Sequence, residues 1–140
     1  MNFIFYVLLF TLFPFIVQSQ IKLEKVTPKI SNLWGIATIN KDEILVTQRS
    51  GNLYRLNVFN KNIFKIESTP KVYNSGQGGL LDVVLHPNFA TNRVLCLSYS
   101  RRDSSGIGTA ITCSKLVGDR LVNSQVIFVS EPGLRGGKHF

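Results

Sequence analysis

Two histidines and a glycine-rich loop carry the side chains of this sequence that could move a proton or hold a ligand. His139 follows two glycines and a lysine, and an imidazole, which titrates near neutral pH, suits proton abstraction from a hydroxyl. Spacing alone favours the simpler interpretation of His139 as a terminal polar residue. His86 precedes Pro87 after an apolar run and has no carboxylate or cysteine neighbour. We therefore expect His86 to hydrogen-bond a loop carbonyl rather than to catalyse.

The glycine-rich loop spans residues 75–81 and contains Gln77. Its glycines let the backbone approach a partner closely, and the Gln77 amide offers both a donor and an acceptor. The loop lacks the Gly-Lys-Ser/Thr ending and the following helix of a phosphate-binding loop, so a plain turn is the alternative. No Ser–His–Asp set, zinc-ligand spacing or carboxylate pair can be assembled from the sequence.

Cys96 and Cys113 lie in two predicted strands and are equidistant from the middle of the loop 101–108 between them. A symmetric hairpin would place the two thiols opposite each other, where an oxidising compartment would allow a disulfide. A slip of one residue would instead send one thiol to the other face of the sheet. Two separate buried thiols, packing as small hydrophobes, therefore remain the alternative.

The elements around these residues are predicted to be short strands, because apolar or alternating runs are cut by Gly, Asn and Asp. No stretch shows a sustained helical period. A unit of four strands occurs twice, at the spacing of about 40–50 residues that is typical of β-propeller blades. The first unit comprises residues 34–39, 44–49, 53–58 and 63–67, and the second comprises 81–87, 94–99, 109–117 and 125–130.

The predicted fold is therefore all-β, with about the first two blades of a β-propeller. Two blades do not close a ring of typically four to eight, and six blades would need on the order of 300 residues. We expect an incomplete chain, the first third of a longer protein. The alternative is a two-blade module that oligomerises into a ring.

The amino-terminal segment predicts export. Residues 3–17 form an uncharged apolar run that is shorter than a membrane-spanning helix needs, and small or branched residues before Gln20 suit a signal peptidase. We expect residues 1–19 to be a signal peptide and residues 20–140 to be the domain, in a periplasmic or secreted protein. An uncleaved anchor is the alternative.

The charge of the chain gives no sign of a nucleic-acid partner. The sequence contains 16 Lys and Arg and eight Asp and Glu, which gives a formal net charge of +8, but the basic residues are scattered along the sequence. Nucleic-acid binding would need a basic stripe with interleaved aromatic residues or a recognisable module, and neither is visible. The net charge is expected to keep the protein in solution.

With these elements in view, the sequence resembles the soluble, PQQ-dependent aldose sugar dehydrogenases of the glucose/sorbosone dehydrogenase family. The likeness covers about residues 30–140 and is most specific over residues 76–89. Further matching stretches are residues 33–37, 45–56, 92–94, 97–100, 108–110, 125–128 and 136–140.

The resemblance implies a six-bladed propeller that binds pyrroloquinoline quinone (PQQ) and calcium near its central axis. Gln77 matches the family glutamine that contacts the quinone, and His139 matches the histidine that takes the proton from the anomeric hydroxyl of the sugar. Aldoses would be oxidised at C1 to lactones, and an external acceptor would take the electrons. Whether the protein forms a homodimer stays open.

The same resemblance places the calcium ligands and the arginines that hold the quinone carboxylates in later blades. We therefore expect the 140-residue chain alone to be inactive. A propeller that binds carbohydrate or protein without redox chemistry is the alternative function, because fold does not set function. A hydrolytic or lactonase-type propeller would need more acids near its axis than this sequence offers.

Overall fold

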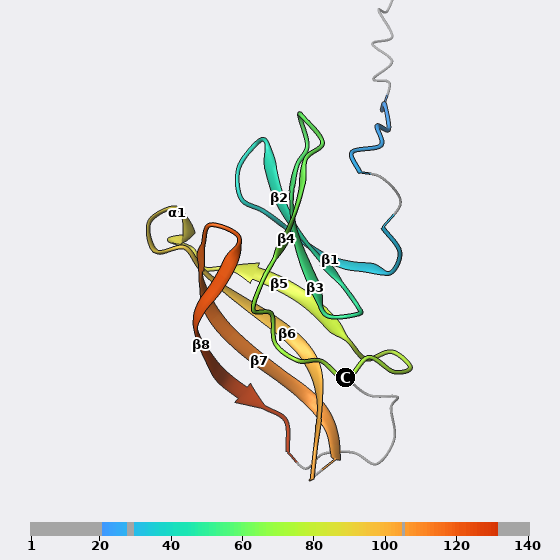
Figure 1. Ribbon diagram of the computed structural model, residues 1–140, viewed down its shortest axis with the longest axis vertical. Helices are drawn as coiled ribbons and strands as arrows, with labels where there is room; N and C mark the ends of the chain where they lie inside the picture. Colours follow the sequence, from blue (N-terminus) through green and yellow to red (C-terminus); the bar gives the residue numbers. More distant parts are fainter. Residues whose placement is uncertain (1–20, 28–29, 105, 132–140) are drawn as a thin grey trace, which may run out of the picture.

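The computed structural model describes residues 21–27, 30–104 and 106–131, which form two antiparallel sheets of four strands each (Figure 1). The first sheet contains β1 (Leu33–Thr38), β2 (Glu43–Gln48), β3 (Asn52–Asn57) and β4 (Ile63–Ile66). The second contains β5 (Leu80–Leu85), β6 (Val94–Asp103), β7 (Gly106–Val117) and β8 (Arg120–Val129). In both sheets the strands lie in the order of the sequence, so the prediction of a repeated four-strand unit is confirmed.

Local sequence sets the turns of the first sheet. Between β1 and β2, the side-chain Oδ1 of Asn40 accepts the backbone N–H groups of Asp42 and Glu43 at 2.8 and 2.9 Å. Asparagine commonly closes a turn in this way, because its short side chain replaces a backbone acceptor. Gly51 turns the chain from β2 into β3 with φ of 106°, a conformation that other residues rarely adopt.

The second sheet differs from the prediction at the ends of its strands. β6 and β7 pair from Val94↔Lys115 to Asp103↔Gly106, so most of the predicted loop 101–108 is part of the hairpin. The outer strand β8 begins at Arg120 rather than at residue 125. A helix of four residues, α1 (Phe89–Asn92), lies in the connection between β5 and β6 and buries Phe89 in the core.

The core forms where the two sheets pack against each other, with β5 in contact with β1 and β2. Thr47 on β2 is fully buried there, and its hydroxyl accepts the Gly35 N–H at 2.8 Å and donates to the Leu81 carbonyl of β5. The buried hydrophobic cluster is contributed by both sheets. Its members are Leu45, Leu53, Ile66, Leu80, Val83, Phe89, Leu95, Leu97, Tyr99, Ala110, Leu116 and Leu121.

An ion-pair cluster at Arg55 connects the two sheets. The Arg55 guanidinium on β3 donates to Glu43 on β2 at 2.7 Å and, through Nε and Nη2, to Asp119 in the turn between β7 and β8 at 2.9 and 2.7 Å. Burial alone would lower the pKa of Arg55, but the two carboxylates more than offset it, and the pKa is raised. Arg55 therefore stays charged and ties the sheets together.

Among the described residues, no helix has the length and apolar composition that crossing a membrane requires. The predicted signal peptide, residues 1–19, lies outside the described residues.

Candidate functional site

The Gln77 loop, residues 75–79, leads directly into β5 (Figure 1). It is closed by a hydrogen bond of 2.9 Å from the Gly78 N–H to the Ser75 carbonyl. Gly78 and Gly79 are buried, whereas the Gln77 side chain is exposed. No described residue hydrogen-bonds the Gln77 amide, so both its donor and its acceptor are open to a ligand.

Glycine at position 79 is required by close packing between the two sheets. Gly79 has φ of 149°, and a Cβ there would overlap the carbonyl oxygen of Arg49 at the end of β2. That same oxygen accepts the Leu80 N–H at 3.0 Å, and the Gly79 N–H donates to the hydroxyl of the buried Ser100 at 2.6 Å. The base of the loop is thus fixed to both sheets, as a binding loop that must hold its shape requires.

Arg49 holds the exposed part of the same loop. Its guanidinium Nη2 donates to the carbonyl oxygens of Gly76 and Gly78, and the group lies 5.7 Å from the centroid of the Trp34 ring. Cation–π contact and charge-assisted hydrogen bonds both favour this position. Arg49 and Trp34 lie in sequence stretches that carry the family resemblance, but nothing in their local pattern assigned them to the loop.

Metal ligands do not gather in the described part of the chain. Within residues 21–27, 30–104 and 106–131, no three His, Cys, Asp or Glu side chains come close enough together to hold a metal ion.

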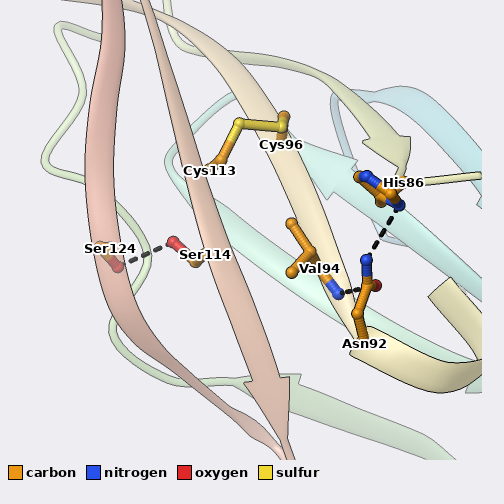
Figure 2. Close-up of a disulfide and its surroundings, with 7 residues drawn as sticks. All are labelled: His86, Asn92, Val94, Cys96, Cys113, Ser114 and Ser124. Atoms are coloured by element: carbon orange, nitrogen blue, oxygen red, sulfur yellow. Dashed lines mark hydrogen bonds between the residues drawn. A yellow bond between two sulfur atoms is a disulfide. The ribbon is translucent and has the colours of Figure 1, made fainter. Parts of the chain in front are cut away.

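His86 has a structural role at the connection between β5 and β6 (Figure 2). Its Nδ1 accepts the backbone N–H of Asn88 at 3.0 Å and the side-chain amide of Asn92 at 2.9 Å. The Asn92 Oδ1 in turn accepts the Val94 N–H at 2.9 Å. Because both partners of Nδ1 are donors, the proton of the neutral ring is on Nε2. The expected bond to a loop carbonyl is therefore replaced by bonds to loop amides, since the short α1 turn presents N–H groups to the ring.

Replacing His86 with alanine is expected to lower the free energy of unfolding by about 1 kcal/mol, because two hydrogen bonds at a partly solvated turn are lost. Urea denaturation followed by circular dichroism would measure the change. Thr91→Ala is the matched control, since Thr91 is an exposed neighbour on the same turn, and its effect should stay within about 0.5 kcal/mol. Equal effects of the two substitutions would contradict the assignment.

Cys96 and Cys113 form a disulfide across the β6–β7 hairpin (Figure 2). They occupy directly opposite positions in the register, with Cα atoms 4.0 Å apart. The symmetric hairpin predicted from the spacing is confirmed, and the alternative of two separate thiols is wrong. No free cysteine remains for catalysis or metal binding in the described residues.

The second predicted site residue, His139, lies outside the described residues. Its assignment as the base remains a prediction.

Comparison with known proteins identifies the family. Residues 30–140 match the family model described as Glucose / Sorbosone dehydrogenase. The chain is 33% identical over 126 residues to the aldose sugar dehydrogenase YliI of Escherichia coli, which covers 87% of this chain and 34% of that protein. The chain thus spans about a third of the length of the curated relatives it matches.

Solved structures agree with this match. The soluble aldose sugar dehydrogenase of Escherichia coli, in its apo form, superimposes with a TM-score of 0.77 and 34% identity, covering 84% of this chain and 35% of that one. The PQQ-bound aldose sugar dehydrogenase of Streptomyces coelicolor has a TM-score of 0.65 at 23% identity, over 79% of this chain and 34% of that one, and supports the fold alone. The two sheets are two blades of the propeller that these dehydrogenases share, as the sequence predicted. The chain belongs to the glucose/sorbosone dehydrogenase family.

Proposed function

We propose that this chain contributes two blades to an exported quinoprotein that oxidises the C1 hydroxyl of aldose sugars to lactones, with PQQ as the electron acceptor in the site. The observation that carries the proposal is the Gln77 loop. Its backbone is fixed by Arg49 and Ser100, and its exposed amide has no partner among the described residues. Membership of a sugar dehydrogenase family and the PQQ-bound state of a protein with the same fold support the assignment.

The Gln77 loop fits the quinone chemically. PQQ carries carbonyl and carboxylate oxygens, which an amide N–H₂ can bind, and when bound it supplies a two-electron acceptor for hydride. Gln77 would orient that group, while Arg49 keeps the loop from relaxing. Calcium is proposed for the whole protein from the family resemblance alone, because the described residues hold no group of three His, Cys, Asp or Glu side chains that could hold a metal ion.

His139 is proposed as the general base. Oxidation of an aldose at C1 removes a proton from the hydroxyl oxygen and a hydride from the carbon, leaving the C=O of the lactone. A ring nitrogen of His139 would take the proton, which is the half of the reaction that a side chain can perform. His86 is unsuited to this role, since its unprotonated nitrogen already accepts two hydrogen bonds.

Export, the external electron acceptor and the need for further blades belong to the same proposal. The apolar segment within residues 1–19 supports delivery to the periplasm or the medium. The 140-residue polypeptide on its own is expected to be inactive, because catalysis needs the complete set of contacts around the cofactor held in place.

The test is aldose-dependent dye reduction by the full-length gene product, reconstituted with PQQ and calcium. His139→Ala should lower kcat by about 10²- to 10⁴-fold, the usual contribution of a general base, while PQQ binding measured by fluorescence stays close to that of the parent. His86→Ala is the matched histidine control and should keep full turnover. Parental turnover in His139→Ala would refute the role of the base, and joint loss of turnover and PQQ binding would make His139 structural.

A further inference from the structure

A basic pocket lies beside the Gln77 loop, in a part of the molecule that the proposed function does not use. It has a volume of about 460 Å³ and is lined by Lys71, Val72 and Tyr73 of the β4–β5 connection and by Arg101 and Arg102 of β6. This volume lies within the range of about 300–1,000 Å³ that is usual for small-molecule sites. Three of the five lining side chains are cationic.

Two of these cations have no acidic partner in the part of the chain that the structure describes. Arg101 forms an ion pair with Asp103, which neutralises one charge. Arg102 lies over the Tyr73 ring, with its guanidinium carbon 4.6 Å from the ring centroid. Among the described residues, no carboxylate pairs with Lys71 or Arg102, so two positive charges at the pocket stay uncompensated.

Stacking on Tyr73 suits Arg102 to bind an anion. A guanidinium that lies over an aromatic ring uses its face for the ring and keeps the N–H groups at its edge for hydrogen bonds. Those N–H groups form a planar fork that matches the oxygens of a phosphate or a carboxylate. Lys71 would add a point charge from the other wall of the pocket.

The two walls of the pocket are held together through the buried Ser100. The Tyr73 N–H donates to the Ser100 carbonyl at 2.7 Å, and the Ser100 hydroxyl donates to the Tyr73 carbonyl at 2.6 Å. The connection that carries Lys71 and Tyr73 is therefore fixed against the strand that carries both arginines. A preformed site loses less conformational entropy when it binds a ligand.

Ser100 also hydrogen-bonds the base of the Gln77 loop, so it contacts both the pocket wall and that loop. Its hydroxyl oxygen accepts the Gly79 N–H at 2.6 Å, and Leu80 pairs with Tyr99 where β5 begins and β6 nears its end. The pocket and the Gln77 loop thus lie at the same end of the second sheet.

We propose that this pocket binds the oxyanion group, phosphate or carboxylate, of a small ligand. The site goes beyond the proposed dehydrogenase function, because it needs neither the quinone nor the base. Arg102 binds the oxyanion through its edge, Lys71 adds charge, and Tyr73 positions Arg102.

The experiment is a titration of the full-length gene product with inorganic phosphate, with acetate and with uncharged glucose, by isothermal calorimetry at low ionic strength. The double variant Lys71→Gln/Arg102→Gln removes both uncompensated charges, and circular dichroism verifies that it folds. The charge-matched control is Lys65→Gln/Lys115→Gln, which removes two exposed lysines outside the pocket.

The parent protein should bind at least one of the two anions, and this binding should not require glucose. The pocket variant should weaken that binding about tenfold or more, as expected for the loss of a bidentate contact and a neighbouring charge, and the control less than about twofold. Binding of phosphate alone identifies a phosphoryl ligand, and comparable binding of acetate identifies a carboxylate. Binding of neither anion, or equal losses in the two double variants, would overturn the proposal. Neither result depends on turnover, so failure here leaves the dehydrogenase assignment standing.

Discussion

Replacing Gly79 with alanine is expected to destabilise the protein by on the order of 3 kcal/mol or more. Two costs add. The φ of 149° is strained for any residue with a side chain, and the new methyl group would overlap the backbone carbonyl of Arg49, which cannot rotate away. Retreat of the loop would also break the hydrogen bonds of Gly79 to Ser100 and of Leu80 to Arg49. Urea denaturation followed by tryptophan fluorescence would measure the loss.

Gly118→Ala separates the two costs. Gly118 has φ of 57°, and a Cβ there would meet nothing within 4 Å, so only backbone strain of about 1 kcal/mol is expected. If both variants lose the same stability, contact between the Gln77 loop and β2 is not what requires glycine at position 79. PQQ binding offers a second measurement, because Gly79→Ala should displace Gln77 whereas Gly118→Ala should not.

Much of the fold follows from local sequence. Runs of alternating residues between turn residues predicted the eight strands in their order, and the equal distance of the two cysteines from the hairpin centre predicted their pairing. These features depend on neighbouring residues and on the twofold period of a strand. The glycines around Gln77 also placed it in a loop, as the structure has it.

The contacts that shape the site depend instead on tertiary packing. The hydrogen-bond partner of Arg49 is 27 positions away in the chain and that of Thr47 is 34 positions away. The partners of Ser100 are 21 and 27 positions away. No local sequence pattern predicts partners at such distances. The basic pocket shows the same limit. Lys71 is distant from Arg101 and Arg102 in the sequence, but the β4–β5 connection runs along β6 and brings it beside them.

Removal of the disulfide by the double substitution Cys96→Ala/Cys113→Ala is expected to cost about 3 kcal/mol of stability, the value for a closed loop of about 15 residues. The two cysteines are 17 positions apart, so the bond restricts the unfolded hairpin more than the folded one. Urea denaturation of parent and variant, each with and without dithiothreitol, would measure the effect.

Reduction supplies the internal control for this prediction. Dithiothreitol should bring the parent close to the stability of the double variant and leave the variant unchanged, whereas a parent insensitive to reduction would contradict the contribution of the disulfide.

The register of β6 and β7 should survive removal of the disulfide, because backbone pairing continues on both sides of the cysteines from Val94↔Lys115 to Asp103↔Gly106. Since Arg101 and Arg102 lie in that paired region, anion binding should persist in the variant under conditions where it remains folded. Loss of anion binding with an intact hairpin would mean that the disulfide, and not the backbone pairing of β6 with β7, positions the two arginines.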